Sequence, residues 1–211
     1  MAIDDLLDEH EQSERVRSWL RNNGAGLIGG VALGLAVILG WQWWQKDQAR
    51  KNEQAHQDYQ AALEGAAGND LKQAQAVVAK LSAEDEIYAD LAGLQLAKAQ
   101  VQAGERDAAI ATLRALTPDA SLRPIVNLRL ARLLNDAGKH DEALKLLAQA
   151  DDASSLEARG DALLAAGKAK EAQEAYTKAL TTLDVASPQR RLVELKLAGA
   201  GGTPPKTGDN A

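Results

Sequence analysis

Residues 137–143 read AGKHDEA, and the same A-G-x4-A pattern occurs at residues 103–109 (AGERDAA) and 166–172 (AGKAKEA). The three glycines, Gly104, Gly138 and Gly167, are 34 and then 29 residues apart. A glycine can end a helix where the backbone needs positive φ, and a small alanine lets the next helix lie close to the first. The pattern therefore predicts a series of helix hairpins.

Other positions agree with a known type of helix-pair repeat. A small residue, Ala97, Ala131 or Gly160, lies seven residues before each glycine. Tyr176, four residues beyond Ala172, is the large residue of a second helix. A period near 34 made of two helices is typical of tetratricopeptide repeats. The shortened second spacing and the missing Trp and Pro make these repeats degenerate, and an irregular helical bundle is the alternative.

A long apolar stretch precedes the repeats. Residues 24–44, GAGLIGGVALGLAVILGWQWW, carry no charge, and Gln42 is their only polar residue. As a helix, 21 residues reach the roughly 30 Å of a bilayer core. Three of the four tryptophans lie at the C-terminal end of the stretch and Trp19 precedes it, as in an interfacial aromatic belt. No small-residue cleavage site follows, so an uncleaved anchor is favoured over a signal peptide.

The span carries a candidate packing face. Gly26, Gly30 and Gly34 repeat every four residues and so share one side of a helix. Such a strip lets another membrane helix approach closely, although glycines are also simply common in membrane helices. Arg15, Arg17 and Arg21 precede the span, and Lys46, Arg50 and Lys51 follow it directly. The count of flanking cations is therefore equal and does not decide the orientation.

The segments around the repeats complete the predicted organisation. We expect a short arm over residues 1–23, a transmembrane helix over 24–44, a helical domain over 45–198, and a disordered Gly/Pro-rich tail over 199–211. A further helix pair is predicted within residues 52–81, broken at Gly65 and Gly68. Residues 82–85 resemble a capping box in which Ser82 caps the next helix, and Ser187 with Pro188 begins a final helix. The predicted fold class is thus all-α, with one membrane helix and an α-solenoid.

Composition excludes several function classes. The 211 residues include 42 alanines, no Cys and no Phe, and the net charge is −6. A β-sandwich core, thiol chemistry and a broad nucleic-acid surface are therefore not expected. The three histidines lie far apart without metal-ligand spacing, and no phosphate-binding loop follows a strand. We predict no cofactor, no metal, no small-molecule substrate and no enzymatic activity.

Stacked helix hairpins present a concave surface that binds other proteins. The repeat spacing places three residues of each first helix toward that surface, although each could equally be ordinary surface or inter-repeat packing. The candidate groove residues are Leu94, Lys98, Val101, Leu128, Arg132, Asn135, Glu157, Asp161 and Leu164.

The order of these features resembles the YfgM family of bacterial inner-membrane proteins. The resemblance is carried by residues 11–23 leading directly into the apolar span, and by the three A-G-x4-A turns. It implies a cytoplasmic N-terminus, a periplasmic helical domain, and association with the SecYEG translocon and a PpiD-type periplasmic chaperone. It also implies that the protein helps to hand client polypeptides to periplasmic chaperones. Two alternatives are a modulator that binds a cytoplasmic stress-response regulator through the acidic N-terminal arm, and a scaffold for an envelope assembly complex.

Overall fold

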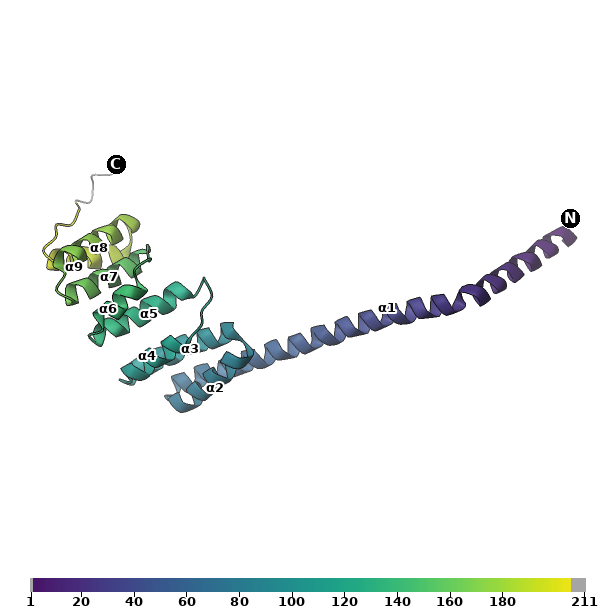
Figure 1. The fold of residues 1–211 in the computed structure, drawn as a ribbon, viewed down its shortest axis with the longest axis horizontal. Coiled ribbons are helices and arrows are strands. Elements are labelled where there is room, and N and C mark those ends of the chain that lie inside the picture. The colour runs from purple at the N-terminus through teal and green to yellow at the C-terminus, as the bar shows by residue number, and fades with distance from the viewer. Residues whose placement is uncertain (1, 206–211) are drawn as a thin grey trace. The chain divides into compact units, whose positions relative to one another are not determined.

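The computed structural model describes the backbone of residues 2–205 and the side chains of residues 13–205. Over this part of the chain it contains nine helices and no strand, which confirms the predicted all-α class (Figure 1). The chain divides into two compact units between Gln54 and Ala55. The helices are α1 (Ala2–Ala67), α2 (Leu71–Glu84), α3 (Glu86–Gln102), α4 (Arg106–Ala115), α5 (Arg123–Asp136), α6 (His140–Leu146), α7 (Ala153–Ala165), α8 (Ala169–Thr182) and α9 (Pro188–Gly199).

The first unit is the N-terminal part of α1, which contains the apolar stretch. By length and composition this helix can cross a membrane, with a mean hydropathy of 1.9 in its most apolar window and none of that window buried. Large side chains such as Ile28 and Trp43 are 73% and 71% exposed. A helix satisfies its own backbone groups and is therefore a stable form for such a segment in lipid.

The second unit consists of helix hairpins closed by three turns of the same geometry. Gly104, Gly138 and Gly167 have φ values of 82°, 76° and 78°, as predicted from the A-G-x4-A pattern. In each turn, the amide of the residue after the glycine donates to a carbonyl five residues earlier at 2.8 Å. These bonds satisfy carbonyls that the helix end would otherwise leave unpaired. The turns pair α3 with α4, α5 with α6, and α7 with α8.

Small side chains form much of the core between these helices. Ala97 and Ala131, the predicted small residues of α3 and α5, are 3% and 1% exposed. At Gly160 on α7, a β-carbon would lie within 2.8 Å of three atoms of the Tyr176 ring. The absence of a side chain there lets this ring pack directly on the backbone of α7, where it is 1% exposed. The small-residue pattern thus sets how closely each pair of helices approaches.

Two predicted helix ends differ in the structure. Gly65 does not break α1 but lies inside it, where a β-carbon would be 3.2 Å from the backbone nitrogen of Ala74 on α2. The cap of α3 is Asp85, whose Oδ1 accepts from the amides of Ile87 and Tyr88 at 3.1 Å. Ser82 remains inside α2, because this helix continues to Glu84.

The C-terminal helix packs on the last hairpin. Helix α9 begins at Pro188 after Ser187, as predicted, and its Val193 and Leu197 are 1% exposed against α7 and α8. After α9, the carbonyl of Ala200 accepts from Nε2 of Gln173 at 2.6 Å. Of the tail predicted to be disordered over residues 199–211, residues 206–211 lie outside the described residues.

Candidate protein-binding groove

A recess between α3 and α5 gathers four of the nine predicted groove residues. Its volume is about 280 Å³. Leu94 and Ala97 of α3 and Leu113 of α4 form a buried apolar floor, and Val101 is 44% exposed at its wall. The residues that line this α3–α5 recess are Leu94, Ala97, Lys98, Val101, Gln102, Leu113, Arg129, Arg132 and Leu133.

Three cations surround the apolar floor. Lys98 lies on α3, and Arg129 and Arg132 lie on α5. Nη1 of Arg129 donates to the carbonyl of Leu94 at 3.4 Å, which connects the two walls. Arg129 was not among the predicted residues, although its position three residues before Arg132 places it on the same side of the helix. That spacing was the signal available in the sequence.

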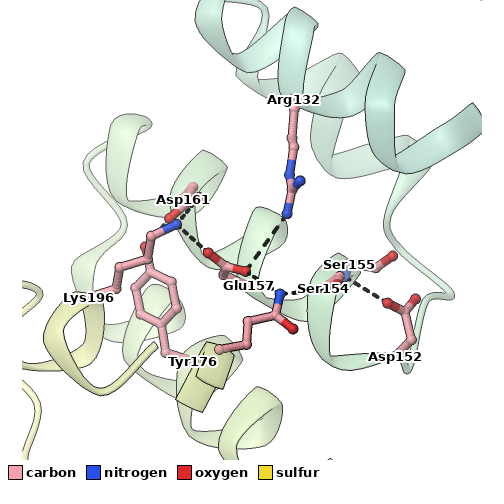
Figure 2. A network of polar contacts seen from close by, with 9 residues as sticks. Arg132, Asp152, Ser154, Ser155, Glu157, Asp161, Tyr176 and Lys196 are labelled. Atoms are coloured by element: carbon pink, nitrogen blue, oxygen red, sulfur yellow. Dashed lines mark hydrogen bonds and ion pairs between the residues drawn. The ribbon is translucent and has the colours of Figure 1, made fainter. Parts of the chain in front are cut away.

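Glu157 and Asp161 of α7, also predicted for the groove, are engaged by α9 and α8 instead (Figure 2). Nζ of Lys196 donates to Oε1 of Glu157 and to Oδ2 of Asp161, both at 2.6 Å. The hydroxyl of Tyr176 donates to Oδ1 of Asp161 at 2.7 Å, and Nε2 of Gln189 donates to Glu157 at 3.2 Å. Since Glu157 is only 3% exposed, its carboxylate is stabilised by these partners rather than by water.

The charge states in this network follow from its geometry. Burial opposes the charge on Lys196, but the carboxylates of Asp161 and Glu157 outweigh it and raise the pKa of this ammonium. Burial also raises the pKa of the Tyr176 hydroxyl, and the neighbouring Asp161 carboxylate adds to that effect. The network therefore holds Lys196 charged and Tyr176 neutral, as a donor.

The three remaining candidates lie apart from the α3–α5 recess. Leu128 is half-buried and lines another recess, formed by the start of α5, the end of α6 and the start of α7. Oδ1 of Asn135 is 2.6 Å from Nδ1 of His140, a contact that joins α5 to the start of α6. Leu164 on α7 is 38% exposed. The nine predicted residues thus do not line one continuous pocket.

A larger recess of about 730 Å³ lies between α4, α5 and α6. Its rim includes Arg114, whose guanidinium pairs with the carboxylate of Glu142. Arg123 and Lys145 also line this recess, so it holds three cations and one carboxylate, whereas no Asp or Glu lines the α3–α5 recess.

The glycine face of α1 is open. A β-carbon at Gly26, Gly30 or Gly34 would meet no atom within 4 Å. The structure therefore leaves room along this face for the close approach of a second helix.

The described residues contain no group of three or more His, Asp or Glu side chains that could hold a metal ion. The side chains of residues 1–12, which include most of the acidic arm considered for a regulator, lie outside the described part.

Stacked helix hairpins with an open recess between first helices define a tetratricopeptide-like helical repeat protein. The family model described as a tetratricopeptide repeat-like domain matches residues 17–202. A solved kinesin light chain from Podosopora anserina, with nearly identical TPR-like repeats, is similar with a TM-score of 0.52 and 20% identity. The similarity covers 70% of this chain and 85% of that one, and it shows the shared fold.

Named relatives are similar along most of the chain. A protein of Escherichia coli (strain K12), named ancillary SecYEG translocon subunit, is 31% identical over 201 residues, which are 90% of this chain and 95% of that protein. Proteins of the same name from Haemophilus influenzae and Aggregatibacter actinomycetemcomitans are 29% and 24% identical, over 68% and 90% of this chain and 72% and 97% of their own lengths. The chain belongs to this family, the YfgM family of ancillary SecYEG translocon subunits, as the sequence resemblance indicated.

Proposed function

We propose that this chain is a non-enzymatic, membrane-anchored subunit that associates with the SecYEG translocon and helps to transfer emerging polypeptides to periplasmic chaperones of the PpiD type. It crosses the inner membrane once, with its N-terminus in the cytoplasm and its helical domain in the periplasm. The observation that carries this proposal is the similarity to the Escherichia coli ancillary subunit, which extends over 90% of the chain and therefore includes both the apolar helix and the repeats.

The two units supply the two requirements of such a subunit. The exposed apolar part of α1 provides the anchor, and its open glycine face provides a surface for a translocon helix. The hairpins provide a recess for polypeptide segments. Because anchoring confines the recess to the membrane where clients emerge, it raises the effective concentration of a weak binding site.

Photo-crosslinking in intact cells tests the contact with the translocon. A crosslinking residue at Val37 lies on the glycine face, seven residues beyond Gly30, and one at Leu39 lies about 180° away around the helix. Both side chains are exposed, at 64% and 62%, and they are two residues apart in depth. We expect translocon adducts from Val37 and few from Leu39. Equal yields would contradict a specific glycine face, and no translocon adduct from either position would contradict the proposed association.

Membrane topology is tested separately. Protease added to intact spheroplasts should degrade the helical domain, and alkaline carbonate should leave the chain in the membrane. A domain that is protected in intact spheroplasts, or a chain that carbonate extracts, would contradict the proposed location. A crosslinker at Gln102, which lines the α3–α5 recess, should in addition give adducts with a periplasmic chaperone or with client chains, and their absence would contradict the transfer role.

A further inference from the structure

We infer that the α3–α5 recess binds an acidic segment of a partner protein, with one apolar side chain of that segment on the floor and its carboxylates on the surrounding cations. This inference rests on the proposed function, since it specifies the chemistry that the protein-binding surface recognises.

The floor of the recess fits an apolar anchor. Leu94, Ala97 and Leu113 are at most 5% exposed, and Val101 adds an exposed apolar wall. The volume of about 280 Å³ is slightly below the range of roughly 300–1,000 Å³ for sites that enclose a whole small-molecule ligand. The recess is therefore suited to one large side chain of a longer polypeptide.

The charge around the floor selects an acidic partner. Lys98, Arg129 and Arg132 line the recess, and no Asp or Glu does. Within residues 13–205, whose side chains are described, no carboxylate pairs with Lys98 or Arg129. A chain with a net charge of −6 thus gathers three cations around one apolar site, which favours carboxylates and disfavours a basic segment.

Arg132 is available to a ligand although it has a partner within the chain. Its Nη2 is 3.7 Å from Oε2 of Glu157, and its side chain is 50% exposed. Lys196 binds the same carboxylate at 2.6 Å (Figure 2), and Gln189 binds it at 3.2 Å. Because Glu157 keeps these two closer partners when Arg132 turns away, the guanidinium can transfer to an incoming carboxylate at little cost. Arg132 thus lies between the recess and the network without being required by the network.

The larger recess at α4, α5 and α6 lacks this arrangement. There Arg114 is already paired with Glu142, an exposed carboxylate on the same rim. Arg123 and Lys145 also line that recess, but the Glu142 carboxylate lies among these cations and repels an acidic segment. No Asp or Glu lines the α3–α5 recess, which is therefore the preferred site.

The test measures binding by the full-length protein in a zwitterionic detergent, using fluorescence anisotropy. The probe is a labelled 12-residue peptide with two central leucines flanked by glutamates and serines. One matched peptide replaces each glutamate with lysine, and another replaces both leucines with serine. We expect binding of the acidic, leucine-containing peptide alone, with an affinity that falls as salt is raised from about 50 mM to about 500 mM.

Variants locate the site. Lys98→Glu and Arg132→Glu should each weaken binding roughly tenfold, because each removes an attractive pair and adds a repulsive one. Val101→Ser should also weaken binding while it leaves the charges in place. Lys170→Glu, at an exposed position on α8, is the matched control and should bind like the wild type. Circular dichroism and thermal unfolding show that each variant is folded.

Comparable binding of the lysine peptide, or an equal loss in Lys170→Glu and Arg132→Glu, would overturn the inference. The proposed function is judged separately by translocon crosslinking from Val37. Crosslinking without binding of the acidic peptide would refute the inference alone. Binding at the recess without any crosslinking would refute the proposed association and leave the chemistry of the recess established.

Discussion

Replacement of Lys196 by Met should destabilise the helical domain strongly. The methionine keeps an apolar stem but removes the ammonium from Glu157 and Asp161, both 2.6 Å away. Glu157, with a side chain only 4% exposed, would retain Gln189 and the more distant Arg132. Removing one partner of a fully buried pair costs about 3–5 kcal/mol. Because Lys196 itself is 27% exposed, water can replace part of the loss, and we expect about 2–4 kcal/mol.

Urea and thermal unfolding, followed by circular dichroism at 222 nm in a mild detergent, measure this effect. A loss near 3 kcal/mol corresponds to a Tm lower by roughly 6–12 °C for a domain of this size. Arg114→Met is the matched control, since it removes a cation from an exposed pair with Glu142 and should cost at most about 1 kcal/mol. Adding Glu157→Gln to Lys196→Met should restore part of the stability. Equal losses in the two single variants, or strict additivity in the double variant, would refute the role given to the network.

Three further predictions concern local packing, backbone and charge. Gly160→Ala should lower the free energy of unfolding by about 1–3 kcal/mol, because the new methyl overlaps the Tyr176 ring. Gly199→Ala is the control: a β-carbon there meets no atom within 4 Å, and stability should rise by up to about 1 kcal/mol. Equal urea midpoints for the two variants would contradict this prediction. Gly138→Ala should cost about 1–2 kcal/mol, since φ there is 76°, and a midpoint unchanged from the wild type would argue against strain. Burial, aided by two nearby carboxylates, raises the pKa of Asp90 above its ordinary value of 3.8. The folded state therefore keeps this proton to higher pH than the unfolded state. The stability of the wild type should fall as pH rises from the ordinary pKa of the carboxyl through its raised pKa in the folded state. Urea unfolding of Asp90→Asn and of the wild type at pH 4 and pH 7 measures this effect. The stability of the variant relative to the wild type should be greater at pH 7 than at pH 4. An equal difference at both pH values would contradict a raised pKa for Asp90.

The features that the sequence predicted well are local ones, in which one type of residue is required at one position of a hairpin. Gly104, Gly138 and Gly167 were identifiable because a helix end at positive φ favours glycine. The small residues Ala97 and Ala131 were identifiable for a similar reason, since their spacing from the glycine is fixed within each hairpin. Gly65 was misinterpreted because a glycine required for close helix packing resembles a glycine that ends a helix.

The parts that sequence could not predict depend on contacts between distant segments. Periodicity assigned Glu157 and Asp161 to the first helix of a repeat. It carries no information about which later segment packs over these two side chains. The cover comes from Lys196 on α9, 39 and 35 residues further along the chain. Likewise, the end of α2 was misplaced because the Ser82 hydroxyl donates to the carbonyl of Val78 at 3.0 Å inside that helix, and Asp85 caps α3 instead. Recess residues on α3 and α5 were found because they lie on repeats of regular spacing.

The placement of the tryptophans gives this protein two separate optical reporters. All four indoles belong to residues 19–44, and in the structure each is about half exposed or more, with Trp41 and Trp44 in ring contact. The helical repeats carry only tyrosines. Excitation near the red edge of the protein spectrum therefore monitors the polarity around the apolar helix alone. A helix that docks there should shift the indole emission, whereas a peptide held between α3 and α5 should leave it unchanged, so the two kinds of association can be followed in one cuvette without any added dye.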